Sequence, residues 1–220
     1  ATWKHWKTNK QTGLWYHYKR ILKDRGCVAL FCQTPFDMQL ASSNPKMLKY
    51  EWIIEKTKAT GFFNAKKAPM KAHEKILVFY RKLPTYNPQK TTGHARKVST
   101  AIHKRNSKQT TNYGKSGLST YDSTERYPRD VLKFKWDTQK SALHSTQKPV
   151  ELLEYFVKTY TNEGDVVLDN CMGSGSLGVA CLNTGRRFIG IEKDTSMFNV
   201  AQERIERKYY EKRSHNSTTQ

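Results

Sequence analysis

Residues 165–178 read DVVLDNCMGSGSLG and decide the fold class of this chain. A run of aliphatic residues ends at Asp169, a glycine-rich turn follows, and the next residues carry an apolar helical pattern. After Gly185, residues 187–191 read RFIGI, which is a second short apolar run. A strand, a tight turn, a helix and another strand are the repeating unit of a helix-covered parallel sheet. We therefore predict an α/β fold with a doubly wound, mostly parallel sheet.

The same turn indicates what the fold binds. Residues 173–178 fit G-x-G-x-x-G, which alone is typical of sites for NAD or FAD. Here the carboxylate of Asp169 ends the strand just before the turn, where it would repel a pyrophosphate but suit a cationic ligand. S-adenosylmethionine carries an ammonium and a sulfonium and no phosphate. Glu192 ends the next strand, where such folds place an acid for ribose hydroxyls. We predict an S-adenosylmethionine site, with a dinucleotide site and a purely structural turn as the alternatives.

The chain before this unit divides into two zones of different composition. The first, residues 1–82, alternates apolar patterns typical of helices and strands. We expect a helix over 14–22 and strands over 27–31, 50–54 and 75–80, the strand over 27–31 being a continuous apolar run and so buried on both faces.

The second zone, residues 83–142, is polar and contains twelve lysines and arginines against four acids. The whole chain carries a formal net charge of +20, which indicates a polyanionic partner, most simply nucleic acid. We interpret this zone as a nucleic-acid-reading insertion, since a structureless loop of this length is uncommon inside a domain. A solvated linker, and a basic surface that serves only solubility, are the alternatives. The candidate DNA contacts are Arg96, Lys97, Lys104, Arg105 and Lys108.

The last zone, residues 143–207, holds the glycine turn and a helix that Pro149 opens. A further helix is expected from Thr195 through Ile205, and residues 208–220 are expected to form a flexible tail. The four cysteines lack the spacing of a zinc site, so we predict reduced thiols and no metal. No run approaches the length of a membrane span and no signal peptide opens the chain. We expect a cytoplasmic protein.

Two motifs together resemble a known family. Residues 144–149 read HSTQKP and residues 169–176 read DNCMGSGS. They are similar to the pairing H-P-T-Q-K-P and D-P-F-x-G-S-G-T of DNA amino-methyltransferases of the permuted beta class, in their phage and bacterial forms. In that class the catalytic half comes first, a target-recognition insertion follows, and the cofactor motif comes last, which is the order seen here.

The resemblance implies a Rossmann-like methyltransferase fold with a basic target-recognition insertion and a role in DNA methylation, as in restriction–modification. It implies S-adenosylmethionine as cofactor, double-stranded DNA as partner and transfer to the N6 amine of adenine, with cytosine N4 or an RNA substrate as alternatives. Glu192 would take the ribose, and Asp194 would lie near the adenine of the cofactor. The residues that the resemblance assigns to the cofactor are His144, Thr146, Gln147, Lys148, Asp169, Cys171, Gly173, Ser174, Gly175, Ser176, Glu192 and Asp194.

The chain also departs from the family pattern. Cys171 stands where the family has an aromatic residue, which predicts weaker packing against the cofactor. The catalytic tetrapeptide, a polar residue followed by Pro-Pro and an aromatic, is absent from the sequence; Pro35-Phe36 follows a different strand and lacks the leading polar residue. We therefore assign no catalytic residue and expect the catalytic strand to lie upstream of these residues. A cofactor- and DNA-binding fragment without activity is the alternative to an enzyme, and the oligomeric state stays open, a dimer being one option.

Overall fold

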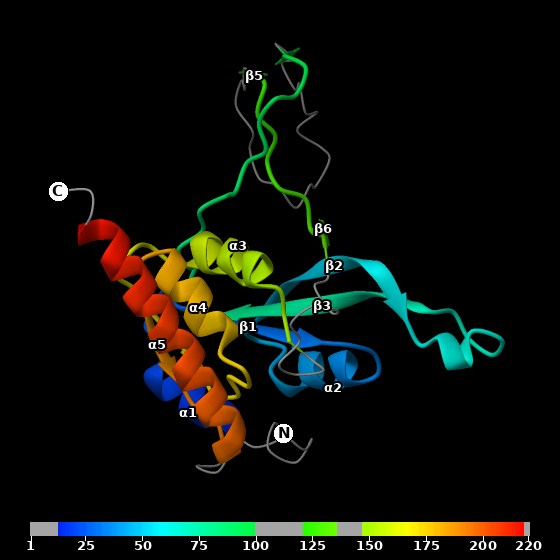
Figure 1. Cartoon of the computed structure of the whole chain (residues 1–220). Coiled ribbons are helices and arrows are strands. Elements are labelled where there is room, and N and C mark those ends of the chain that lie inside the picture. Colours follow the sequence, from blue (N-terminus) through cyan, green and yellow to red (C-terminus); the bar gives the residue numbers. More distant parts are fainter. Residues whose placement is uncertain (1–12, 100–120, 136–146, 218–220) are drawn as a thin grey trace. The chain divides into compact units, whose positions relative to one another are not determined.

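The computed structural model describes residues 13–99, 121–135 and 147–217 of the chain (Figure 1). It divides into two compact units. The main unit comprises Ala1–Asn87 and Arg129–Gln220, and the insertion unit comprises Pro88–Pro128. The insertion unit is thus narrower than the 83–142 zone that the composition suggested.

A four-stranded mixed sheet forms the centre of the main unit, in the order β1-β3-β2-β6. Its strands are β1 (Cys27–Cys32), β2 (Leu48–Thr60), β3 (Lys71–Tyr80) and β6 (Val131–Phe134). Strand β3 pairs antiparallel with both β1 and β2, whereas β6 runs parallel to β2. The three predicted early strands are confirmed. The predicted insertion zone extends too far along the chain, because the residues of β6 belong to the main sheet.

Helices cover both faces of this sheet. The two-residue period of β3 sends Ile76 and Val78 to one face and Leu77 and Phe79 to the other, and all four are buried. Helices α1 (Leu14–Ile21) and α2 (Phe36–Ser43) supply Trp15, Tyr18 and Leu40 to the cluster that contains Leu77 and Phe79. Helix α3 (Val150–Tyr160) supplies Leu152, Phe156 and Tyr160 to the cluster that contains Ile76 and Val78.

Helix α3 is also fixed to the sheet by polar contacts inside its apolar cluster. The indole N–H of Trp52 on β2 donates to the hydroxyl of Tyr160 at 2.6 Å, and the Tyr50 and Tyr160 hydroxyls lie 3.0 Å apart. Buried tyrosine and tryptophan need such partners, because an unpaired polar group costs free energy in an apolar core. The Phe156 ring stacks parallel to the Tyr160 ring. Tyr160 and Phe156 together anchor the segment that precedes the glycine turn.

The predicted strand–turn–helix–strand unit is confirmed. Strand β7 (Val166–Asp169), helix α4 (Ser176–Asn183) and strand β8 (Arg187–Gly190) follow in order, and β7 pairs parallel with β8. Helix α5 (Thr195–Ser217) then packs against α4. The expectation that residues 208–220 form a flexible tail is wrong for their first ten residues, because α5 continues to Ser217.

Strand β1 is less buried than its apolar sequence predicts. Val28, Leu30 and Phe31 are only partly buried and Ala29 is exposed, so the prediction of a strand buried on both faces is wrong. The reason lies in the strand pairing. Within the described residues, β1 pairs only with β3 and β7 pairs only with β8, so each strand has one edge without a strand partner.

The insertion unit is held by hydrogen bonds rather than by an apolar core. Strands β4 (Lys97–Ser99) and β5 (Tyr121–Ser123) pair antiparallel, and Thr91 and Arg126 form an isolated bridge beside them. The guanidinium of Arg126 donates to the carbonyls of Ala95, Ser123 and Glu125. This agrees with its composition, which lacks the aliphatic side chains that a core requires.

Candidate functional site

The glycine turn lies between β7 and α4, at the carboxyl end of β7. Gly173 has φ +52°, and a Cβ placed on it would meet no atom within 4 Å. Glycine adopts such left-handed conformations without strain, and the open space lets a ligand approach the backbone. Gly178 has the opposite reason to be glycine, because a Cβ there would lie 2.4 Å from Ile205 Cδ1 on α5. Gly173 therefore leaves room for a ligand, whereas Gly178 lets α4 pack closely against α5.

Glu192, just after β8, is bound to the turn by its own carboxylate. One oxygen accepts the backbone N–H of Gly173 at 2.9 Å, and the other accepts those of Lys193 at 2.8 Å and Asp194 at 3.1 Å. These amides, that of Asp194 first, hold the pKa of Glu192 below its usual range. Since a carboxylate offers about four lone pairs, acceptor capacity remains for a hydroxyl.

Asp169 ends β7 beside the same turn. Its Oδ1 accepts the backbone N–H of Cys171 at 3.0 Å. Burial, and secondarily the negative charge of Glu192, raise the pKa of this carboxyl above its usual value. A partly buried carboxylate next to a second one is electrostatically unfavourable until a cation binds. The geometry therefore favours a ligand with positive charge at this point.

Gln147 and Lys148 tie the segment before α3 to two parts of the main unit. The Ser174 hydroxyl donates to Gln147 Oε1 at 3.3 Å, which brings Gln147 to the glycine turn. Lys148 turns to β3 instead, where its Nζ lies 2.5 Å from Glu74 Oε2 and 5.1 Å from the centre of the Phe31 ring. Gln33 donates to the other oxygen of Glu74 at 3.0 Å.

Arg204 on α5 is a residue of this site that the sequence did not reveal. Its Nη1 donates to the carbonyl of Ser174 at 3.0 Å and to the Ser176 hydroxyl at 3.0 Å. Ser174 and Ser176 are buried, and their hydroxyls bond within the protein. An arginine in the middle of a basic helix carries no local signal of such a contact.

Tyr18 on α1 reaches the turn from the first zone of the chain, residues 1–82. Its hydroxyl donates to Asn170 Oδ1 at 2.9 Å, one residue past Asp169. Burial, with the nearby Cys171 and Asp169, raises the pKa of Tyr18 to about 12, so it is a neutral donor at physiological pH. Asn170 stands where the resembling family has proline, and here it makes a contact that proline cannot make.

Residues 4–203 match the family model described as N6_N4_Mtase, DNA methylase. The chain belongs to this DNA methylase family. Among curated relatives, the type II methyltransferase M2.DpnII of Streptococcus pneumoniae is 46% identical over 63 residues, which cover 29% of this chain and 24% of that protein. The putative methylase YubD of Escherichia coli K12 is 40% identical over 76 residues, which cover 34% of this chain and 33% of that protein. The matches thus span a third or less of these relatives.

Solved structures confirm the Rossmann-like methyltransferase fold. The M1.HpyAVI–SAM complex superposes with a TM-score of 0.59 at 23% identity, over 86% of this chain and 78% of that one. The PvuII DNA methyltransferase, titled cytosine-N4-specific, gives a TM-score of 0.58 at 12% identity, over 89% of this chain and 74% of that one. At these identities the likeness establishes the fold of this DNA methylase family member.

The remaining predicted residues divide by placement. Asp194 is exposed and immediately precedes α5, where its Oδ1 accepts the N–H of Met197 at 3.0 Å. Cys171 is exposed beside the turn. In the insertion unit Lys97 is exposed, and exposed Arg96 forms a two-pronged pair with Asp122 at 2.7 and 2.6 Å. The predicted residues that lie outside the described part of the chain are His144, Thr146, Lys104, Arg105 and Lys108.

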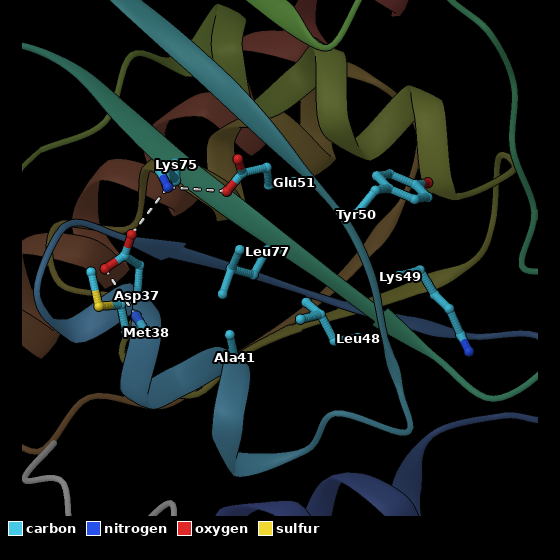
Figure 2. A pocket seen from close by; sticks show the side chains of 9 residues that line it. All are labelled: Asp37, Met38, Ala41, Leu48, Lys49, Tyr50, Glu51, Lys75 and Leu77. Carbon is cyan, nitrogen blue, oxygen red and sulfur yellow. Dashed lines mark hydrogen bonds and ion pairs between the residues drawn. The ribbon is translucent and has the colours of Figure 1, made fainter.

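Pro35-Phe36, the one Pro-aromatic pair near a strand end, has a structural role. Pro35 precedes α2, and Phe36 begins the helix and packs against the cluster of Trp15 and Leu40. A hollow of about 330 Å³ lies beside α2, and none of the predicted cofactor residues lines it. Figure 2 shows Lys75 at this hollow between Asp37 and Glu51, at 3.1 and 3.2 Å from their carboxylates.

Two further predictions concern absences. Among the described residues, no group of histidine, cysteine and acidic side chains has the arrangement of a metal site. Within the same ranges, no helix is long and apolar enough to cross a bilayer.

Proposed function

We propose that this chain is the donor-binding and DNA-reading part of an S-adenosylmethionine-dependent DNA methyltransferase that acts on the N6 amine of adenine. The observation that carries the proposal is the arrangement of Asp169, Gly173 and Glu192 around one turn, in a chain of the DNA methylase family. Cytosine N4 is the second candidate acceptor, because one solved structure of the same fold is titled cytosine-N4-specific. Double-stranded DNA in the bacterial cytoplasm is the proposed setting, supported by the net charge of +20 and the bacterial relatives.

The residues of the turn fit the proposed cofactor. Asp169 offers a carboxylate that is disfavoured without a cation, and S-adenosylmethionine brings an ammonium and a sulfonium. The space beside Gly173 admits the nucleoside against the backbone, and Glu192 retains acceptor capacity for a ribose hydroxyl. Gln147 and the backbone of Ser174 would border the methionine part.

The bound cofactor supplies an electrophilic methyl group, and the protein supplies position. An exocyclic amine is a weak nucleophile because its lone pair is delocalised into the ring, so it must be held in line with the methyl group. The base must also leave the duplex stack to reach the site. The groups assigned here all serve the donor, and the family's acceptor tetrapeptide is absent from the sequence. We therefore propose that these 220 residues bind the cofactor and transfer no methyl group by themselves.

Calorimetry tests the donor site. S-adenosylmethionine should bind more tightly than NAD, and Asp169→Ala and Glu192→Ala should each weaken binding by roughly 1–3 kcal/mol, the contribution of a charge-assisted hydrogen bond. Glu163→Ala, which removes an exposed acid outside the turn, is the matched control and should leave affinity unchanged. Tighter binding of NAD than of the sulfonium ligand would exclude the assignment.

Transfer of labelled methyl groups to unmethylated duplex DNA tests the acceptor side. The 220-residue chain should give almost no product, whereas a variant extended by a strand that ends in the family's acceptor tetrapeptide should restore transfer. Nucleoside analysis of that product distinguishes N6-methyladenine from N4-methylcytosine. Robust transfer by the short chain would show that an acceptor clamp lies within it.

A further inference from the structure

Strands β2 and β3 continue as a two-stranded ribbon past the rest of the sheet (Figure 1). Strand β6 pairs with β2 as far as Lys56, and β1 pairs with β3 from Lys75 onward. Beyond these positions lie residues 57–73, which we call the β2–β3 tip. Gly61, at φ +93°, and the 3-10 turn η2 (Phe62–Asn64) reverse the chain there. At about 3.3 Å per residue, the ribbon reaches roughly 20 Å from Glu55 to Gly61.

Two large aromatic side chains are exposed at this tip. Phe62 is 75% exposed and Phe63 is 101% exposed, with ring centres 6.4 Å apart. Phenylalanine is usually buried, since each such side chain gains about 1.5–3 kcal/mol on leaving water. Two adjacent exposed rings at the end of the ribbon therefore indicate a surface that a partner covers.

The charge of the tip identifies the chemistry of that partner. Residues 57–73 contain Lys58, Lys66, Lys67 and Lys71 and no acidic residue, and all four lysines are exposed. Exposed rings between lysines match a polyanion that also offers flat apolar faces. DNA has both, as phosphates and stacked bases. A two-stranded ribbon also fits the major groove, and phenylalanine is among the wedges that proteins insert between base steps.

Side-chain contacts link the base of the tip to the glycine turn. Glu74, the residue after the tip, holds Lys148, and the neighbouring Gln147 contacts Ser174 in the glycine turn. The base of the tip is thus connected to the turn by two adjacent side-chain contacts. A duplex whose target base reached the donor site would pass close to the ribbon.

We propose that the β2–β3 tip is a second DNA-contacting element, separate from the insertion unit, and that it enters a groove of the substrate duplex. Phe62 and Phe63 contact the bases, and the four lysines contact the phosphates on either side. The inference rests on the proposed function, because the partner is the DNA of a methyltransferase. Rings inserted beside the target would help to hold an extruded base out of the stack.

Fluorescence anisotropy of labelled duplex DNA, measured over a range of salt concentrations, tests the proposal on the full chain. Phe62→Ala with Phe63→Ala should weaken binding about fivefold or more at every salt concentration, because base stacking on an aromatic ring is worth about 1 kcal/mol or more. Lys66→Gln with Lys67→Gln should instead lower the slope of log affinity against log salt by about 0.9 per lost phosphate contact.

Matched controls lie elsewhere on the main unit. Tyr209 and Tyr210 on α5 are adjacent aromatics that are 45% and 64% exposed, and changing both to alanine should leave DNA affinity unchanged. Lys46 and Lys49 are exposed at the opposite end of β2, and changing both to glutamine should leave the salt slope unchanged. Equal effects of test and control pairs would overturn the proposal.

A cross-linking measurement keeps the test independent of affinity. Phe63→p-benzoylphenylalanine should cross-link to duplex DNA on illumination. Cross-linking to a second copy of the chain, or phenylalanine-dependent binding to anionic lipid vesicles with unchanged DNA affinity, would overturn the proposal. If the parent chain binds neither S-adenosylmethionine nor DNA, both the proposed function and this inference are wrong. If the parent chain binds both and the tip variants bind DNA as tightly as the parent, only this inference is wrong.

Discussion

The ion pair between Lys148 and Glu74 should stabilise the fold only as a pair, and Glu74→Leu tests this. The side chains are 23% and 10% exposed, so the substitution leaves an ammonium largely buried without its carboxylate. Breaking a buried pair from one side costs roughly 3–5 kcal/mol. Because the Phe31 ring, 5.1 Å away, still faces Lys148, we expect the lower end, about 3 kcal/mol. Replacing both residues, as Glu74→Leu with Lys148→Met, should recover most of this loss.

Urea unfolding measures the difference directly. With a slope of about 2 kcal/mol per molar urea, Glu74→Leu should lower the midpoint by about 1.5 M, and the double variant should return close to the parent. Glu55→Leu removes the carboxylate of an exposed pair with Lys133 and should shift the midpoint little. A loss below about 1 kcal/mol for Glu74→Leu, or a double variant no more stable than that single one, would refute the reasoning.

Three further outcomes follow from the site and the insertion unit. Asp169→Asn should stabilise the unliganded protein at neutral pH while weakening S-adenosylmethionine binding. Folding raises the pKa of Asp169, so the contribution of this residue to stability falls as the pH rises above its unfolded pKa. Denaturation at acidic and neutral pH should show that decline in the parent protein and not in the variant. Gly178→Ala should cost about 1–3 kcal/mol by thermal or urea unfolding through its clash with Ile205, and Ile205→Val should recover part of it. Neutralising four basic residues of the insertion zone together should flatten the salt dependence of DNA binding by about 0.9 per lost phosphate contact, and an unchanged slope would place that zone off the DNA. The four are Lys97, Lys104, Arg105 and Lys108.

The parts of the fold that could be predicted are those that local patterns specify. The unit around residues 165–191 combines two aliphatic runs, glycines with distinct steric roles and a helical repeat, and all of its elements form as expected. The acids at the strand ends were equally predictable, because strand termini bring such side chains to one edge of a sheet. Asp169 and Glu192 do lie at the same turn, through their contacts with Cys171 and Gly173.

The contacts that could not be predicted join residues far apart in the sequence. Lys148 binds Glu74, 74 positions earlier, and Arg204 reaches Ser174 from 30 positions away. No periodicity reports which distant side chain an exposed-looking lysine or arginine will meet. The length of α5 was missed for a related reason, since its last turns lack the apolar stripe that marks a packed helix.

The solvent exposure of individual side chains was the least predictable property. It decides whether the positive charge that contacts DNA lies in the polar zone alone or also on the β2–β3 tip. The net charge of +20 pointed to the polar zone, because that zone lacks a core, whereas the lysines of the β2–β3 tip lie among apolar residues that resemble an ordinary strand pair. Only the structure shows that Phe62 and Phe63 face solvent. If both surfaces contact one duplex, their phosphate contacts are separate, so the losses in salt slope from the two sets of lysine substitutions should add. A combined loss no larger than either alone would mean that the two surfaces do not bind DNA at the same time.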